Sequence, residues 1–418
     1  MAYYTSVFIC LLCIFTDGTV ASSPIRDQVL YIKPISDEEI QVIKQISNQY
    51  QTALFQPISM DAIGINQEIH LYINATDIEE VRSQLAAGNI TYSVMIEDVE
   101  QLIKSQKPSS QVFHPRAPNS YYEKYHPLQE IYLWMSHIVR AYPSLIQRIL
   151  IGPSAEKRLI YVLKIYKGVN ASKGAFWIDC GIHAREWISP AFCQWFVQYL
   201  LDTQDVVING ILNSYEIYIL PVWNVDGYDY TWTTDRFWRK NRSKNNVKGC
   251  IGTDLNRNWD ANWGEQGSSK NPCSETYSGQ YPESEPEVKA VAAFIRQRSD
   301  HIKSYISIHS YSQMILFPYS YKRSRSKDHT ELYYLTGKAA SALMKLHGTR
   351  YSHGQSAELI YLTSGSSDDW AYDLGIKYSF TFELRDTGRY GFFLPPHLIK
   401  PTCEETIVAL KVILQHLA

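Results

Sequence analysis

Three segments of the chain end in side chains that could bind a metal ion and use it. His183 and Glu186 follow one apolar run directly, and His309 ends a second. Two imidazoles and one carboxylate are a typical ligand set for catalytic Zn²⁺, which keeps a further position open for water. Glu383 ends a third apolar run and would be the free carboxylate that takes a proton from that water. A His-x-x-Glu pair alone would also suit a surface turn, so the prediction depends on the three segments together.

The four side chains lie at the ends of predicted β-strands. From residue 120 to residue 418, helical segments alternate with short apolar strands, at 159–166, 175–181, 216–222, 304–309 and 378–384. This alternation is typical of an α/β fold with a mixed, mostly parallel sheet and helices on both faces. Ligands bind such sheets beyond the carboxyl ends of the strands. We therefore expect the four side chains to converge there.

Residues 27–105 predict a separate, smaller α/β unit. Short strands are expected at 28–32, 68–73 and 91–96. Two helices between them would each begin at a capping box, Ser36 with Glu39 and Thr76 with Glu79. A strand–helix order of this kind predicts an open sheet with helices on one face.

Both ends of this smaller unit carry processing signals. Residues 1–21 predict a signal peptide, because the apolar run 7–15 is too short to span a bilayer and small residues follow it. An uncleaved anchor is the alternative. A polar, Pro-rich linker at 107–118 contains the bond between Arg116 and Ala117, which suits a trypsin-like protease. A plain interdomain linker is the alternative there.

Secretion would make the remaining cysteines disulfide candidates. Closeness along the chain suggests two pairs, Cys180–Cys193 and Cys250–Cys273, although sequence alone does not fix the pairing. Cys403 would remain a free buried thiol. Four sequons predict N-glycosylation, at Asn74, Asn89, Asn170 and Asn241. The first two lie close together, which predicts a well exposed N-terminal unit.

The composition is that of an ordinary globular protein, with 45% hydrophobic residues and a formal net charge of −2. This balance supports neither nucleic-acid nor membrane partners. The basic run 236–242 could still be a nucleic-acid patch or a solvated face.

Segment 254–259 lies in a long loop, 249–281, where Arg and Asn side chains could bind a carboxylate. Asp369 could cap a helix, whereas Asp368 could receive a cation at the bottom of a pocket.

Together these segments resemble the zinc metallocarboxypeptidases of the A/B type. Five motifs occur in the family order: His-Ala-Arg-Glu-Trp, Arg-x-Trp-Arg-Lys, Asp-Leu-Asn-Arg-Asn, Ile-His-Ser-Tyr-Ser and Phe-Glu-Leu-Arg-Asp-Thr-Gly-Arg-Tyr-Gly. The resemblance covers nearly the whole chain. It implies a carboxypeptidase fold at 117–418, preceded by a small open-sandwich activation propeptide at 22–116.

The resemblance implies a catalytic role for five of these residues. His183, Glu186 and His309 match the zinc ligands, so one Zn²⁺ per chain is expected. Glu383 matches the general base. Arg239 matches the group that polarises the scissile carbonyl and then stabilises the oxyanion.

Six further positions match groups that contact the substrate. Asn256, Arg257 and Tyr361 match the clamp on its terminal carboxylate, Arg185 and Tyr311 match secondary subsites, and Asp368 matches the side-chain pocket. In the family, an Asp at that last position accompanies substrates that end in Lys or Arg, which is B-type specificity. An apolar terminal residue would leave Asp368 buried and unpaired, at a cost on the order of several kcal/mol.

B-type enzymes include a digestive pancreatic form and a plasma form. This chain is more similar to the plasma form, at 177–182, 253–256, 281–289 and 323–329. The resemblance thus implies a secreted, monomeric plasma zymogen, cut after Arg116 by a trypsin-like serine protease. The active form would remove C-terminal Lys or Arg from peptides and proteins, including fibrin-type substrates, and so slow fibrinolysis. A digestive enzyme is the alternative.

One departure from the family pattern lies in the long loop. B-type enzymes usually carry a further cysteine pair there, where this chain has Gly264 and Ser278. The loss of both cysteines predicts a more mobile loop and an unaffected zinc site. An inactive binding protein on the same fold would lack a zinc ligand or the base, and this sequence lacks none.

Overall fold

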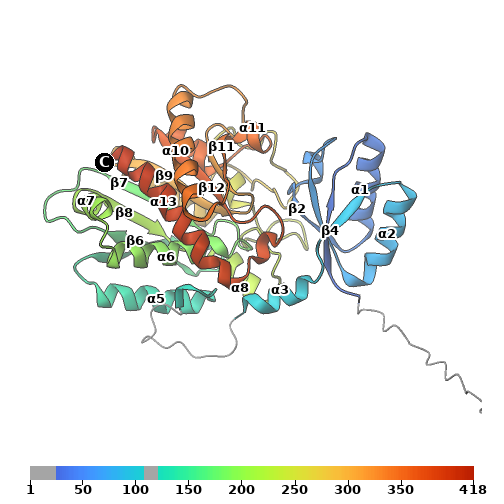
Figure 1. Ribbon diagram of the computed structural model, residues 1–418, viewed down its shortest axis with the longest axis horizontal. Helices are drawn as coiled ribbons and strands as arrows, with labels where there is room; N and C mark the ends of the chain where they lie inside the picture. The colour runs from blue at the N-terminus through green and yellow to red at the C-terminus, as the bar shows by residue number, and fades with distance from the viewer. Residues whose placement is uncertain (1–24, 108–120) are drawn as a thin grey trace, which may run out of the picture.

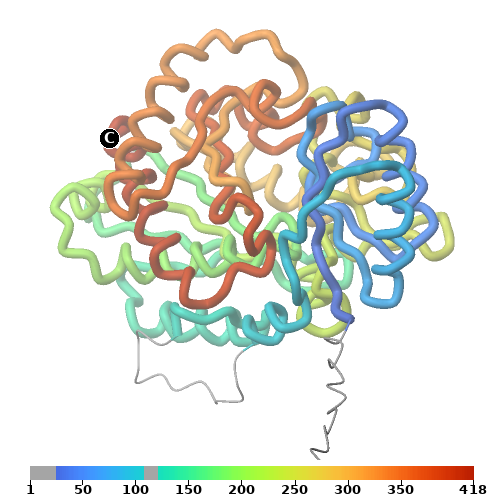
Figure 2. The backbone as a smooth tube through the Cα atoms, turned by 45° about the vertical axis from the view of Figure 1, so that its right-hand side comes forward, coloured from blue at the N-terminus to red at the C-terminus, as the bar shows by residue number. Residues whose placement is uncertain are grey.

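The computed structural model describes residues 25–107 and 121–418, which form a small unit beside a large one (Figure 1). Figure 2 shows the small unit, in blue to cyan, seated directly against the large one. The expected signal peptide, 1–21, and the bond between Arg116 and Ala117 lie outside the described residues. Both therefore stay predictions.

An antiparallel sheet with the strand order β2-β3-β1-β4 organises the small unit. Its strands are β1 (Gln28–Ile32), β2 (Thr52–Gln56), β3 (Ile69–Ile73) and β4 (Tyr92–Ile96). Its helices are α1 (Asp37–Gln49), α2 (Ile78–Ala87) and α3 (Val99–Gln106). Helices α1 and α2 cover one face, and Leu30 and Ile43 belong to the apolar core between sheet and helices (Figure 1). The expected open sheet is confirmed.

The two expected capping boxes of this unit differ in outcome. Ser36 caps α1 as predicted, because its Oγ accepts the backbone N–H of Glu39 at 3.3 Å. The predicted capping box of Thr76 and Glu79 does not form. Asn74 instead caps a short 3₁₀ turn ahead of α2, and its Oδ1 accepts the backbone N–H of Thr76 at 3.0 Å.

A sheet of eight strands runs through the large unit, in the order β11-β10-β12-β9-β7-β8-β6-β5 within the described ranges. The strands are β5 (Ile146–Pro153), β6 (Leu159–Ile165), β7 (Ala175–Cys180), β8 (Glu216–Leu220), β9 (Ile302–Ser310), β10 (Met314–Phe317), β11 (Ser352–Gln355) and β12 (Tyr378–Leu384). The central strands β12, β9, β7 and β8 are parallel, whereas β10, β6 and β5 join antiparallel. The mixed, mostly parallel sheet is confirmed.

Helices pack on both faces of this sheet. They are α5 (Leu128–Ala141), α6 (Ile188–Asp202), α7 (Val206–Ser214), α8 (Val225–Thr233), α9 (Pro286–Arg296), α10 (His329–His347), α11 (Ser356–Leu359), α12 (Ser367–Asp373) and α13 (Ile399–Leu417). Successive side chains of β7 point to opposite faces: Trp177 contacts Phe294 of α9, and Phe176 stacks on Tyr215 next to α7. None of the helices in the described ranges has the length and apolarity that a membrane crossing requires.

An apolar interface cluster joins the two units. Its buried members are Val29, Phe55, Ile96, Val99, Tyr311, Phe392 and Phe393. The ring of Phe55, on β2, lies 5.1 Å from that of Phe392 and 5.7 Å from that of Phe393, between centroids. Val29 belongs to this cluster, whereas its neighbour Leu30 belongs to the core under α1 and α2. The small sheet thus docks by the face that these helices leave open.

Candidate functional site

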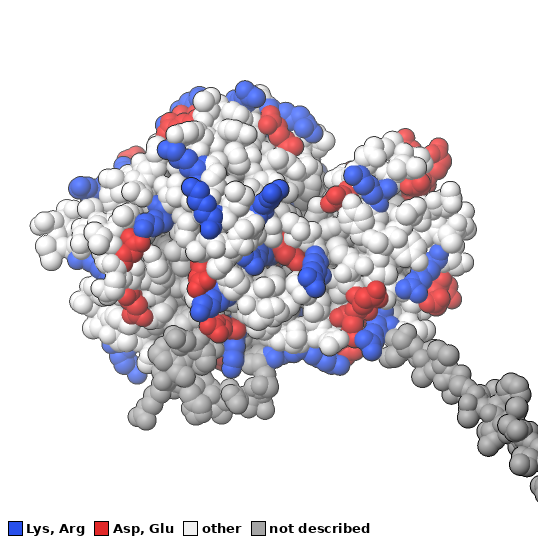
Figure 3. Space-filling view, viewed as in Figure 1, with Lys and Arg blue, Asp and Glu red and all other residues white. Residues whose placement is uncertain are grey.

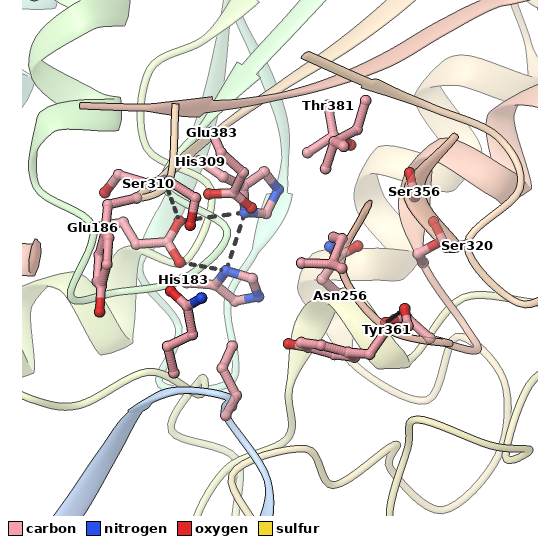
Figure 4. A pocket seen from close by; sticks show the side chains of 18 of the residues that line it. His183, Glu186, Asn256, His309, Ser310, Ser320, Ser356, Tyr361, Thr381 and Glu383 are labelled. Carbon is pink, nitrogen blue, oxygen red and sulfur yellow. Dashed lines mark hydrogen bonds and ion pairs between the residues drawn. The ribbon is translucent and has the colours of Figure 1, made fainter. Parts of the chain in front are cut away.

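Two imidazoles and a carboxylate converge at the carboxyl ends of β7 and β9 (Figure 4). His183 Nδ1 lies 2.8 Å from Glu186 Oε1 and 3.1 Å from His309 Nδ1. His309 Nδ1 lies 3.3 Å from Glu186 Oε2. With bonds of about 2 Å, tetrahedral Zn²⁺ holds its ligand atoms on the order of 3.3 Å apart. This buried donor set therefore fits zinc in both spacing and chemistry.

A turn that requires glycine presents the first two ligands. Gly181 follows β7 with φ of 72°, in the left-handed region that favours glycine. A Cβ atom at this position would lie 3.0 Å from the ring of Pro190. The backbone therefore leaves the strand sharply, and His183 and Glu186 point back toward β9 (Figure 4).

Hydrogen bonds behind both imidazoles fix the direction of their rings. His183 Nε2 lies 3.2 Å from Asp254 Oδ1. His309 Nε2 lies 3.1 Å from Ser307 Oγ, which donates to Asp179 Oδ1 at 2.7 Å. Outer partners of this kind orient metal-binding histidines and leave the other ring nitrogen for the metal. Both rings therefore present Nδ1 to the site.

Glu383 lies on β12 opposite His309 on β9, so the two strands place it beside the ligands. Burial raises the pKa of this carboxyl group to about 8, with the positive His309 and Arg239 opposing and the negative Glu186 adding to the shift. A bound cation would lower that pKa again. The arrangement provides a carboxyl group that can both accept and return a proton near neutral pH.

Arg239 is buried beside the same ligands, with 1% of its side chain exposed. Its Nη2 and Nε donate to Asp254 Oδ2 at 2.9 Å and 3.2 Å. Its Nη1 lies 3.7 Å from Glu186 Oε1 and is a buried donor without a hydrogen-bond partner among the described residues. A rigidly held donor of this kind can stabilise negative charge that develops on a reacting oxygen.

The pocket around these groups also contains most of the expected substrate-binding residues. They are Asn256, Arg257, Tyr311, Tyr361 and Asp368. Arg257 donates to the carbonyl oxygens of Asn256 and Gly267, at 2.7 Å and 2.9 Å. Asn256 Oδ1 accepts the backbone N–H of Ser367 at 2.9 Å. These bonds attach the long loop to α12 and hold both side chains at the pocket wall.

Arg185, the remaining expected subsite, lies outside this pocket. It lines a neighbouring cleft between the two units, together with Trp238 and Glu275. Its guanidinium carbon lies 4.3 Å above the ring of Phe392, and Nη1 donates to the carbonyl oxygen of Phe237 at 3.4 Å. In this state Arg185 supports the interface cluster.

The adjacent acids Asp368 and Asp369 have different surroundings. Asp368 lines the pocket, whereas Asp369 accepts the backbone N–H groups of Ser320 and Tyr321 at 2.9 Å and 3.1 Å. Burial and the charge of Asp368 raise the pKa of Asp369 well above its usual range. Asp369 does not cap α12, so that expectation is wrong: it anchors the loop that follows β10.

The small unit contributes to the pocket as well. Its resemblance to an activation segment implies that it covers the cleft, whereas the sequence did not indicate which of its residues reach the pocket. Phe55, Gln56, Pro57 and Ile58 line it together with the metal-site residues. They belong to the end of β2 and the turn after it. Pro57 is a turn signal in the sequence, but nothing local shows that this turn reaches another unit. The docked small unit therefore narrows access to the site.

The predicted glycosylation of Asn241 is wrong. Its side chain is fully buried, and Nδ2 donates to Glu285 Oε2 at 2.8 Å and to Glu287 Oε2 at 3.0 Å. A glycan on this nitrogen would break both bonds and has no room. Asn89 and Asn170 are exposed, and Asn74 is half-buried.

The basic run 236–242 does not form a nucleic-acid patch, because Arg236, Arg239, Lys240 and Asn241 are buried. On the face seen in Figure 3, basic and acidic side chains are interspersed across both units.

The expected disulfides, Cys180–Cys193 and Cys250–Cys273, are both formed, and Cys403 is free and buried. Ser278, at a position of the missing cysteine pair, accepts the indole N–H of Trp263 through its carbonyl oxygen at 2.9 Å.

Comparisons with known proteins agree with this geometry. The family model described as zinc carboxypeptidase matches residues 131–409, and that described as carboxypeptidase activation peptide matches residues 30–106. Carboxypeptidase B2 of Bos taurus is 51% identical over 94% of this chain and 93% of the relative. Carboxypeptidase B of Homo sapiens is 44% identical over 94% of each chain. The crystal structure of thrombin activatable fibrinolysis inhibitor superimposes with a TM-score of 0.91 at 50% identity, covering 94% of this chain and 99% of the other.

Proposed function

Because the chain belongs to the zinc carboxypeptidase family and carries a carboxypeptidase activation peptide, we propose that its active form removes one C-terminal Lys or Arg from peptides and proteins. The observation that carries this specificity is Asp368, buried in the wall of the pocket that contains the metal ligands. A Lys or Arg side chain would pair with that carboxylate. An apolar terminal residue would leave it desolvated without a partner.

Three groups of this chain would carry the reaction. His183, Glu186 and His309 would hold Zn²⁺, which would supply acidification of a water molecule and polarisation of the scissile carbonyl. Glu383 takes the proton of the attacking water and later delivers it to the leaving nitrogen. Arg239 Nη1 donates to the carbonyl oxygen as negative charge develops on it.

The clamp residues would restrict the enzyme to chain ends. Arg257 can grip the terminal carboxylate of the substrate, and Asn256 and Tyr361 line the same pocket. An internal peptide bond offers no carboxylate at that place. The enzyme is therefore an exopeptidase.

The small unit would keep the uncut chain inactive toward large substrates. Phe55 to Ile58 line the pocket, and Phe55 also belongs to the interface cluster. A trypsin-like serine protease would cut between Arg116 and Ala117 and allow the unit to leave.

This chain would act as a secreted plasma monomer on fibrin-type substrates. This part of the proposal rests on the chain's similarity to carboxypeptidase B2 and to thrombin activatable fibrinolysis inhibitor. A digestive role is the second candidate, favoured by the similarity to carboxypeptidase B.

A hydrolysis panel tests this proposal. Peptides that end in Arg, Lys or Phe are incubated with the uncut chain and with the trypsin-treated chain. We expect fast release of Arg and Lys, slow release of Phe, and a large gain on protein substrates after trypsin. Preferred release of Phe would contradict the role of Asp368, and full activity of the uncut chain on protein substrates would contradict the inhibition.

A further inference from the structure

Asn224 joins two parts of the active site through a single side chain. It is fully buried and precedes α8, where its Oδ1 accepts the backbone N–H of Gly227 at 2.9 Å. Its Nδ2 donates to two carbonyl oxygens, those of Ile182 and Arg239, each at 3.2 Å. Ile182 directly precedes the ligand His183. One amide group therefore ties the backbone of the ligand segment to the backbone of the arginine.

Further backbone contacts leave this junction little freedom. The N–H of Ala184 donates to the same carbonyl oxygen of Arg239 at 3.0 Å, and the N–H of Asn224 donates to that of Gly181 at 3.0 Å. A Cβ atom at Gly227 would lie 2.5 Å from the carbonyl oxygen of Lys240. The segments that carry Asn224, Arg239 and His183 are thus closely packed and joined by several backbone hydrogen bonds.

The guanidinium of Arg239 is held at its other end by Asp254, which accepts from Nε and Nη2. Among the described residues Nη1 has no hydrogen-bond partner, so it can donate to a reacting oxygen. The position of Nη1 therefore depends on Asp254 at the side chain and, at the backbone, on Asn224 together with the N–H of Ala184. A donor that stabilises a transition state must be placed before the reaction begins.

We propose that Asn224 is a positioning residue for the peptidase reaction: it fixes Arg239 relative to His183, so that Nη1 meets the oxygen that becomes negative. This inference rests on the role of Arg239 in the proposed function. The side chain must be an amide, because one end accepts from Gly227 while the other donates twice. A carboxylate would turn an oxygen toward two carbonyl oxygens, and a serine hydroxyl is too short to reach both.

The test measures kcat and KM of the trypsin-cleaved enzyme on a peptide that ends in Arg. Asn224→Asp keeps the size and the acceptor for Gly227 but loses the two donated bonds, and Asn224→Ser is the second variant should the first not fold. We expect kcat to fall about 10- to 100-fold, because a misplacement of about 1 Å costs on the order of 100-fold. KM should change much less. Zinc content per chain should stay the same, and affinity for a phosphonate transition-state analogue should fall in parallel with kcat.

A double variant that combines the Asn224 substitution with Arg239→Ala distinguishes a positioning role of Asn224 from a general structural role. If Asn224 acts through the arginine, its substitution costs little more in the Arg239→Ala background. Asn258→Ser is the matched control, since Asn258 is equally buried and its amide donates to the carbonyl oxygens of Ser278 and Tyr281, not to that of Arg239. Its effect should add to that of Arg239→Ala.

Two results would overturn the inference. Losses from Asn224→Asp and Arg239→Ala that multiply fully in the double variant would contradict positioning through Arg239 and leave the proposed function intact. An Arg239→Ala variant with undiminished kcat would contradict the role of the arginine itself, and with it the inference.

Discussion

His70 Nδ1 of the small unit lies 2.6 Å from the hydroxyl oxygen of Tyr311 in the large unit, and the two rings stack with their centroids 5.8 Å apart. Tyr311 belongs to the wall of the active-site pocket. The small unit therefore contacts a residue of the pocket wall directly, through a hydrogen bond and a stacked ring. Burial lowers the pKa of His70 to about 4, although the charge of Glu68 acts in the opposite direction.

This lowered pKa predicts that acid weakens docking of the cleaved activation unit. A released His70 regains a pKa of about 6.5, so the released unit binds a proton more readily than the docked one. Docking is then strongest above about pH 6.5, and at pH 5.5 the dissociation constant rises about tenfold. Surface plasmon resonance with the cleaved fragment between pH 7.5 and 5.5 measures this change. His70→Gln can still bond to Tyr311 without titrating, and an equal pH dependence in that variant would contradict the assignment.

Gln106 is expected to be a second determinant of how readily the cleaved small unit leaves the large unit. This buried side chain accepts from Arg236 Nε at 3.1 Å and donates to the carbonyl oxygen of Leu394 at 3.1 Å. Gln106→Ala leaves the buried Nε of Arg236 unpaired, at about 1–3 kcal/mol, whereas the carbonyl oxygen of Leu394 still accepts from the hydroxyl of Tyr125. The cleaved unit should therefore dissociate roughly 5- to 150-fold more readily. Gln84→Ala, on α2 and bonded within the small unit, should leave dissociation unchanged. Equal behaviour of the two variants would remove this role for Gln106.

Replacement of Glu383 separates proton transfer from metal binding. Glu383→Gln keeps the size of the side chain but cannot take a proton, so kcat should fall by about 10²- to 10⁴-fold. Zinc content should stay at one ion per chain, because Glu383 is not among the three converging ligands. Metal analysis and turnover on a C-terminal Arg peptide check both parts. Loss of the metal together with activity would assign Glu383 to the ligand set instead.

Replacement of Asp368 should change which C-terminal residue the enzyme prefers. Asp368→Ile removes the charge that would pair with a basic terminal side chain, so kcat/KM for C-terminal Arg should fall by about 100-fold or more. Release of terminal Phe should rise. The neighbouring Asp369→Asn serves as the control, because Asp369 bonds to the backbone of residues 320 and 321. That variant should lose thermal stability and keep its preference for Arg.

The sequence predicts the strands that carry the site because they are long, apolar and central. The runs that end near His183, His309 and Glu383 are buried on both faces, and the parallel arrangement brings their carboxyl ends together. The strands β2, β5, β10 and β11 were missed, β2 being largely half-buried. β10 and β11 have only four residues each, and β5 is an edge strand with many exposed positions. Short or half-exposed segments carry too little periodicity to be recognised.

The parts of the site that the sequence missed depend on tertiary contacts. Nothing local in the turn at Pro57 shows that it enters the pocket of another unit. The sequon at Asn241 has the correct pattern, yet the buried carboxylates of Glu285 and Glu287 take its amide. Arg185 matches a subsite in sequence, and docking of the small unit gives it a different neighbourhood. In each case, a partner distant in the chain decides what the residue does.

The dependence of peptide hydrolysis on bound zinc tests the metal site most directly. The trypsin-cleaved protein is analysed for bound zinc and for release of Arg from a peptide, first as purified, then after chelation, and then after addition of one equivalent of Zn²⁺. We expect one zinc per chain, loss of activity with loss of the ion, and recovery on its return. Undiminished release of Arg by protein without zinc would contradict this dependence.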